Sequence, residues 1–158
     1  MKAKTIAAAL VAGTMLAGCG GGGGSSSGDP ASFARQVYEH VFKGDTGWTY
    51  DHLHPAQRKL VSYNDFNSCL QAALLMAKSF GSDFSQNKVT RVTTGKKSST
   101  KVPGTETEDR AVGVTIYFMN AKHPGKADST AGHVFFTDEG LRWVMDAEEI
   151  GKERKGKC

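Results

Sequence analysis

Five histidines are the side chains in this sequence best suited to metal binding or proton transfer. They are His40, His52, His54, His123 and His133. Zinc sites need ligand spacings such as H-x-x-x-H or C-x-x-C, and neither occurs here. His52 and His54 lie two residues apart, so on a helix they would point to different sides. We therefore predict no metal site and expect surface histidines around a turn.

The sequence has no motif for phosphate binding or hydrolysis in the strand-to-helix context that such motifs require. The glycine run of residues 20–24 follows no predicted strand and precedes Asp29-Pro30, so it predicts no phosphate-binding loop. No G-x-S-x-G elbow joins a predicted strand to a helix. The sequence therefore indicates no cofactor.

The first eighteen residues have the pattern of an export signal. Lys2 and Lys4 form a basic head, and residues 6–16 form an almost wholly apolar run. This run is shorter than the roughly 20 residues that a membrane-spanning helix needs. It ends in small residues, which is typical of a cleavable signal.

Leu16-Ala17-Gly18-Cys19 resembles the lipobox of bacterial lipoproteins. The resemblance implies a diacylglycerol on the Cys19 sulfur and cleavage before this residue, which removes residues 1–18. A thiolate is the nucleophile that can carry such a lipid, and two acyl chains suffice for stable anchoring. We expect an extracytoplasmic protein of the cell envelope whose membrane contact is this anchor. An ordinary secretory signal with a chance cysteine is the alternative.

Lipidation at Cys19 would leave two further cysteines, Cys69 and Cys158. Outside the cytoplasm these thiols can oxidise, and a disulfide between them would hold the C-terminal tail against a predicted helix. The alternative is that Cys69 is a small core residue and that the terminal thiol is free.

Composition divides the remaining chain into a linker, one domain and a tail. Residues 20–28 are all glycine or serine, so residues 19–29 are the lipidated cysteine and a flexible linker. Residues 30–150 are long enough for one α+β domain, and residues 151–158 form a basic tail. Loss of Lys2 and Lys4 lowers the formal net charge from +4 to +2. This slight excess gives no reason to expect nucleic-acid binding.

The domain is predicted to begin with helices. Asp29-Pro30 has the order of an N-cap and a first-turn proline, and predicts a helix from about Ala31 to Lys43, closed by Gly44. A short turn within residues 45–55 and a short helix over residues 55–60 should follow. Ser62 and Asp65 have capping-box spacing and predict a helix over residues 63–80. Its buried stripe would be Phe66, Cys69, Leu70, Ala73 and Ala77.

Strands are predicted after residue 81, where the apolar period becomes alternating. The expected strands are residues 88–94, a weak one near 99–102, 110–119, 133–137 and 141–145. Residues 96–110 are polar around a Pro103-Gly104 turn, and residues 121–129 should form a loop. The strand over residues 110–119 carries apolar side chains on each of its two faces, so it should be central in the sheet. Gly140 suits a left-handed position in the last hairpin.

Helices followed by antiparallel strands predict an α+β fold, with N-terminal helices packed on one face of a curved sheet. Residues 48–55, the pair Phe66 and Cys69, and residues 140–143 resemble landmarks of small bacterial lipoproteins with a nuclear transport factor 2-like, or cystatin-like, domain. This resemblance implies a cone-like sheet that often encloses an apolar pocket. Its enzymes, of the ketosteroid isomerase-like or polyketide cyclase-like kind, use a carboxylate or histidine beside a tyrosine in the pocket.

Position in such a cone selects the candidate pocket residues Tyr38, Trp48, Tyr50, Tyr117, His133 and Trp143. For catalysis the candidates are Tyr38, Tyr50, Tyr117, His133 and Asp146, among which no pair has a telling spacing. We therefore expect a non-catalytic module that binds a small apolar ligand or another envelope protein. A pocket enzyme is one alternative, favoured if a pair such as Tyr50 and Asp146 faces a closed cavity. A structural module is the other, favoured if the cone is filled by Phe33, Phe66, Ile116 and Trp143.

Overall fold

The computed structural model of the chain describes residues 28–119 and 127–155. Several predictions lie wholly or mostly outside the described residues: the export signal, Cys19 with most of its linker, the loop over residues 121–129, and the terminal Cys158. The helices are α1 (Pro30–Lys43), α2 (Thr46–Asp51), α3 (Pro55–Arg58), α4 (Tyr63–Ser79) and α5 (Ala147–Glu153). A single 3₁₀ turn, Phe84–Gln86, connects α4 to the first strand.

Local capping sets the ends of the two long helices as the sequence predicts. The Asp29 carboxylate accepts hydrogen bonds from the backbone N–H groups of Ala31 and Ser32, and so caps α1. Gly44 ends α1 with a φ of 71°, a conformation that a side chain would disfavour. The Ser62 hydroxyl accepts from the Asp65 N–H at the start of α4.

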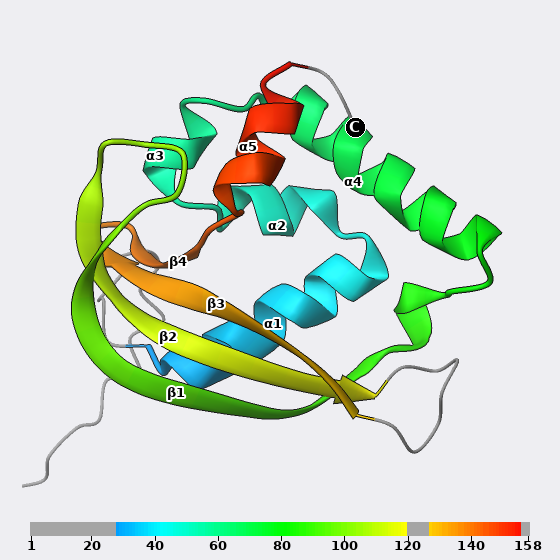
Figure 1. Ribbon diagram of the computed structural model, residues 1–158, viewed down its shortest axis with the longest axis horizontal. Coiled ribbons are helices and arrows are strands. Elements are labelled where there is room, and N and C mark those ends of the chain that lie inside the picture. The colour runs from blue at the N-terminus through cyan, green and yellow to red at the C-terminus, as the bar shows by residue number, and fades with distance from the viewer. Residues whose placement is uncertain (1–27, 120–126, 156–158) are drawn as a thin grey trace, which may run out of the picture.

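Four antiparallel strands form one sheet in the order β1-β2-β3-β4, and the sheet curves around α1 (Figure 1). They are β1 (Lys88–Lys101), β2 (Glu108–Met119), β3 (Ala127–Thr137) and β4 (Gly140–Trp143). The strand predicted to be central, β2, pairs with β1 on one side and β3 on the other. The fold is α+β, with the N-terminal helices on the concave face of the curved sheet, as predicted.

The strand boundaries differ from the prediction in several places. The last strand, expected over residues 141–145, ends at Trp143, and the central strand begins at Glu108 rather than at residue 110. Residues 88–94 and 99–102 were expected as two strands, but they belong to one strand, β1, with register shifts between Val89 and Arg91 and between Thr94 and Lys97. Such shifts let a strand bend and continue. The strand β3 begins at residue 127 rather than at 133, because it pairs with β2 along its whole length. Strands can pair through their backbones without alternating apolar side chains. The polar halves of β1 and β3 therefore gave no sequence pattern that predicts a strand.

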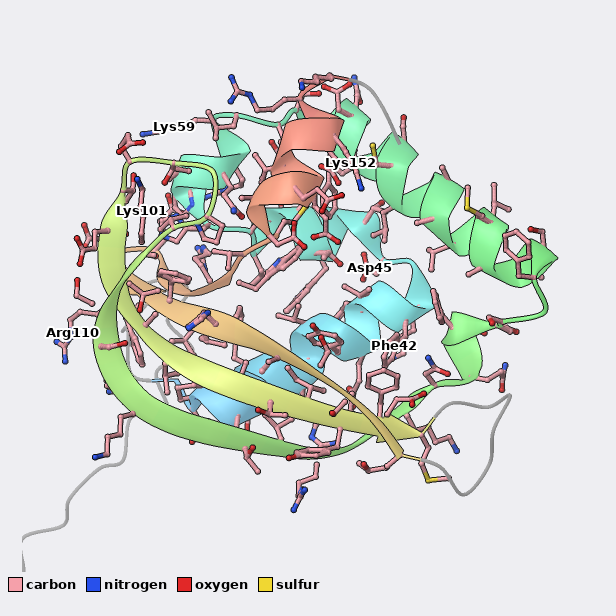
Figure 2. All side chains as sticks on the ribbon, in the orientation of Figure 1. Phe42, Asp45, Lys59, Lys101, Arg110 and Lys152 are labelled. Atoms are coloured by element: carbon pink, nitrogen blue, oxygen red, sulfur yellow. The ribbon has the colours of Figure 1, made fainter. Side chains whose placement is uncertain are left out.

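The main core lies between α1 and the concave face of the sheet. Ala34, Val37 and Phe42 are the buried residues of α1. The Phe42 ring meets the Phe118 ring of β2 with 5.4 Å between centroids, and it points from α1 toward the sheet (Figure 2). The remaining buried members come from the sheet: Val89, Val112, Val114, Ile116, Val134 and Leu141.

Only the first half of α4 packs against the core. Phe66 and Cys69 are its buried residues, whereas Ala73, expected in the buried stripe, is exposed. Farther along the helix Leu75 is 68% exposed. The second half of α4 therefore stands away from the sheet (Figure 1). The space between α4, α1 and α5 is incompletely filled by side chains.

Candidate functional site

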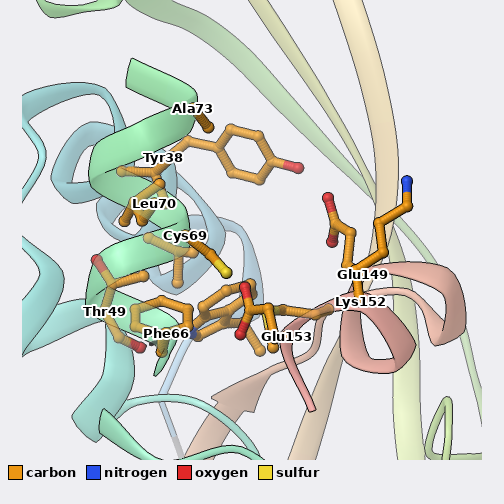
Figure 3. Close-up of a pocket in the computed structure, with 13 residues that line it drawn as sticks. Tyr38, Thr49, Phe66, Cys69, Leu70, Ala73, Glu149, Lys152 and Glu153 are labelled. Atoms are coloured by element: carbon orange, nitrogen blue, oxygen red, sulfur yellow. Dashed lines mark hydrogen bonds between the residues drawn. The ribbon is translucent and has the colours of Figure 1, made fainter. Parts of the chain in front are cut away.

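A cavity of about 420 Å³ lies in that space. This volume is within the range of small-molecule sites. Its apolar lining comes from α1, α4, β4 and the segment after β4, and its polar lining comes mainly from α5 (Figure 3). The lining residues are Val37, Tyr38, Val41, Thr49, Phe66, Cys69, Leu70, Ala73, Trp143, Met145, Glu149, Lys152 and Glu153.

Helical spacing turns the lining side chains of α1 and α4 toward each other. Val37 and Val41 are four residues apart on α1, and Phe66 and Leu70 are four apart on α4. Residues at this spacing share one face of a helix. The two faces meet across the cavity and supply most of its apolar surface.

Trp143 forms part of the lining, and the N–H group of its ring is already hydrogen-bonded within the protein. The indole N–H donates to the Thr49 carbonyl oxygen at 2.7 Å. A parallel β-bridge pairs the backbone of Trp143 with that of Leu53. In this bridge the Trp143 N–H donates to the His52 carbonyl, and the His54 N–H donates to the Trp143 carbonyl. The ring is thus held rigidly between β4 and the chain after α2.

The helix α5 brings carboxylates to the cavity. Asp146 and Glu149 form a capping box at its start, and Ile150 is buried beneath it. Glu149 and Glu153 are four residues apart and both line the cavity. No helix was predicted over these residues, although the spacing of Asp146 and Glu149 was the available signal. The basic tail was expected from residue 151, but α5 continues through that position to residue 153.

Glu153 is the most unusual polar group of the site. Only 8% of its surface is exposed, and its Oε2 atom has no hydrogen-bond partner among the described residues. Burial, followed by the nearby carboxylates of Glu149 and Asp65, raises the pKa of Glu153 to about 7. A carboxyl group of this kind can hold a proton at neutral pH, or accept a donor from a ligand.

Two further polar groups show the same influence of burial. Burial raises the pKa of Glu149, and the neighbouring Asp146 carboxylate adds to this effect. Burial also raises the pKa of the Tyr38 hydroxyl, which points toward Glu149 (Figure 3). Lys152 lines the cavity too, but its ammonium lies 2.6 Å from the Glu148 carboxylate.

Of the six residues predicted for the pocket, Tyr38 and Trp143 line this cavity. Trp48 instead stacks between two histidines, with its ring 4.1 Å from His40 and 3.7 Å from His52 between centroids. This aromatic stack lies beside Phe33. The sequence pattern of α2 did not indicate which of its side chains face the cavity.

The other three predicted pocket residues also lie elsewhere. Tyr50 donates its hydroxyl hydrogen bond to the Val61 carbonyl at 2.9 Å. Tyr117 lies beneath the Arg91 guanidinium, 4.0 Å from its ring centroid. His133 is exposed on β3. Tyr117 and His133 belong to the sheet face opposite the buried Ile116 and Val134, because alternate strand residues point to opposite faces.

The arrangements that would favour the two alternative functions are not found. Tyr50 and Asp146 do not meet, since one is bonded to the Val61 carbonyl and the other caps α5. The apolar residues expected to fill the cone leave the cavity open: Phe66 and Trp143 line it, while Phe33 and Ile116 pack elsewhere in the core.

His54 corrects the expectation of surface histidines. Its side chain is buried, its Nδ1 accepts from the Ala56 N–H, and its Nε2 donates to the Asp109 carboxylate at 3.1 Å. Burial lowers the pKa of His54, although Asp109 opposes the effect. The residue is thus a neutral ring that joins the start of α3 to β2. No cluster of three potential metal ligands occurs within residues 28–119 and 127–155.

Cys69 is buried in α4 and borders the cavity. Its proposed partner Cys158 lies outside the described residues, so the disulfide stays a prediction. No helix in the described part of the chain is both long and apolar enough to cross a bilayer.

A comparison with solved structures finds a likeness of fold. No protein-family model matches the chain, and no curated protein matches its sequence. A crystal structure from Campylobacter jejuni, described as that of a candidate NTF2-like transpeptidase, is similar with a TM-score of 0.44 and 11% identity. The similar region covers 73% of this chain and 96% of the other.

Proposed function

We propose that this chain is a non-catalytic binding module that holds a small apolar ligand in the cavity between α1, α4 and α5. The observation that carries the proposal is the cavity itself, with a volume of about 420 Å³ and a largely apolar lining. Apolar sites with a few placed polar groups are the usual form of small-molecule sites. The Trp143 indole N–H already donates to the Thr49 carbonyl, so Trp143 offers a ligand the apolar part of its ring.

We further propose that the domain has a nuclear transport factor 2-like architecture and works outside the cytoplasm on a lipid anchor. The support for the anchor is the pattern Leu16-Ala17-Gly18-Cys19 behind a basic and apolar leader. The same location favours a disulfide between Cys69 and Cys158. The ligand would then be one that reaches the membrane surface.

Calorimetric titration of the purified full chain with adamantanol, a compact and uncharged apolar probe, tests the binding proposal. We expect binding to the native chain and loss of binding in Leu70→Trp, because the larger ring fills the cavity. Leu75→Trp is the matched control, since Leu75 lies on the exposed part of α4. No binding by the native chain, or binding that Leu70→Trp leaves unchanged, would contradict the proposal.

A pocket enzyme is the second candidate, and the raised pKa of Glu153 is the observation that favours it. A carboxyl that titrates near neutral pH can act as a general acid or base. This candidate predicts exchange of the α-hydrogens of a bound cyclic ketone with deuterated solvent, lost in Glu153→Gln. Exchange at the same rate with and without the protein would reject it.

A further inference from the structure

The carboxylate of Glu153 faces the cavity with bonding capacity that the described residues do not use. It lines the cavity, it is 8% exposed, and its Oε2 has no hydrogen-bond partner within residues 28–119 and 127–155. A buried polar atom without a partner lowers the stability of the fold, so such atoms are rare in proteins. An oxygen in this position is an acceptor for a donor that a ligand would bring.

The charges around Glu153 determine whether the ligand's donor group should be charged or neutral. Glu149 lines the same cavity one helical turn earlier, and the Asp65 carboxylate at the start of α4 acts on Glu153 as well. Among the described lining residues the one cation is Lys152, whose side chain is 59% exposed and paired with Glu148. When these carboxyl groups are ionised, the interior of the cavity is therefore negative and favours a cation.

The rest of the lining determines the other part of the ligand. Val37, Val41 and Leu70 provide aliphatic surface, and Phe66 and Trp143 provide aromatic rings. Figure 3 shows the Glu149 carboxylate across the space from Leu70 of α4, with the Glu153 side chain reaching into the space from α5. An apolar body next to α1 and α4 would place a charged group at the carboxylates.

We infer that the ligand is a small amphipathic amine, whose apolar body fills the cavity and whose ammonium group donates to Glu153, with Glu149 beside it. The inference rests on the proposed function, because it names the class of ligand for the same cavity. It distinguishes amines from neutral apolar compounds and from fatty carboxylates, which the carboxylate pair would repel.

A proton is linked to this binding. An ammonium group favours the ionised form of Glu153, so binding displaces the proton that the free protein holds below neutral pH. The charged and titratable groups that face Glu153 from the packed elements are Glu149 and Lys152 on α5, Asp65 on α4 and Tyr38 on α1. Amine affinity should rise by up to about 25-fold between pH 5.5 and 7.5, since the ionised fraction of a carboxyl with a pKa of about 7 rises from about 3% to about 76% over this range.

Titration with three adamantane compounds that share one apolar body tests the inference. Calorimetry of the full chain at pH 7.5 would compare adamantylamine, adamantanol and adamantane carboxylate. We expect the amine to bind at least about tenfold more tightly than the alcohol, and the carboxylate to bind most weakly. Titrations in buffers of different ionisation enthalpy at pH 6.5 should show proton release with the amine alone.

Glu153→Gln should remove the preference for the amine and its proton release, while adamantanol still binds. Glu106→Gln is the matched control, because the Glu106 carboxylate is 96% exposed and does not line the cavity, and it should keep the preference. If the alcohol or the carboxylate binds as tightly as the amine, the amine inference is overturned but the binding function stands. If none of the three binds, both are overturned.

Discussion

At the scale of single residues, Glu153 shows how burial gives an ordinary side chain unusual properties. The same carboxyl at the surface would be ionised and solvated at neutral pH. Here the apolar lining and two neighbouring carboxylates favour its protonated form. Because the pKa is higher in the folded than in the unfolded state, the folded protein binds an extra proton between about pH 4.5 and 7. The stability associated with that proton is present below this range and is lost as the pH rises through it.

Replacing Glu153 with glutamine should therefore raise the stability of the protein at alkaline pH. We expect the free energy of unfolding of Glu153→Gln to exceed that of the native chain by about 1–3 kcal/mol at pH 8, with little difference at pH 4. Urea unfolding at both pH values measures this. Glu148→Gln controls for loss of charge on α5, and equal stability of Glu153→Gln and the native chain at pH 8 would show that Glu153 is not desolvated.

At the scale of elements, Gln57 of α3 joins three parts of the chain that are remote in sequence. Its side-chain N–H₂ group donates to the carbonyl oxygens of Pro103 and Met145, both at 2.9 Å, and its Oε1 accepts from the Met145 N–H. The residue has no exposed surface. It thus holds the β1–β2 turn and the segment between β4 and α5 against α3, and the position of α5 depends on it.

Gln57→Ala should destabilise the fold, because it leaves the backbone groups of Pro103 and Met145 buried without partners. We expect a loss of about 3 kcal/mol or more in the free energy of unfolding. Gln36→Ala is the matched control, since Gln36 lies exposed on α1, and it should change the stability by less than about 0.5 kcal/mol. Similar unfolding midpoints for the two variants in urea would argue against the structural role of Gln57.

At the scale of the whole molecule, the proposed arrangement is a folded domain that a glycine and serine linker joins to a membrane anchor. A coil of this composition and length has a root-mean-square reach on the order of 15–18 Å. The domain would stay near the bilayer and turn freely, so that the cavity could meet ligands at the membrane surface.

The proposed lipid anchor predicts that replacing Cys19 moves the protein out of the membrane fraction of the cell. Cys19→Ser removes the sulfur that would carry the lipid, so the thioether cannot form. We expect the native protein to label with radioactive palmitate in cells and to sediment with membranes, and the variant to lose the label. Label retained in Cys19→Ser would place the lipid elsewhere or show that the motif does not act as a lipobox.

The disulfide predicts the state of the remaining thiols. Non-reducing mass spectrometry of the mature protein should show Cys69 and Cys158 both blocked to alkylation, and reduction should release two thiols. A chain-entropy estimate for so long a loop is about 4–5 kcal/mol, so Cys158→Ser should lower the stability by up to this amount. Two alkylated thiols before reduction would exclude the bond.

The sequence by itself determined those features that depend on near neighbours in the chain. The caps at Asp29 and Ser62, the left-handed Gly44 and the alternation in β2 are local, and they sufficed to predict the α+β class. The polar half of β1 and the start of β3 were missed because backbone pairing with β2, rather than side-chain pattern, makes them strands.

Only the tertiary structure decided the cavity and its chemistry. Tyr38 and Trp143 were predicted for the pocket, but nothing local to Trp48 or Tyr117 indicates that one stacks with histidines and the other faces outward. The burial of Glu153 requires α5 to pack across α4, and these segments are about eighty residues apart in the chain. Desolvation and charge coupling depend on distance in space, so a property such as the raised pKa of Glu153 exists only after such segments meet.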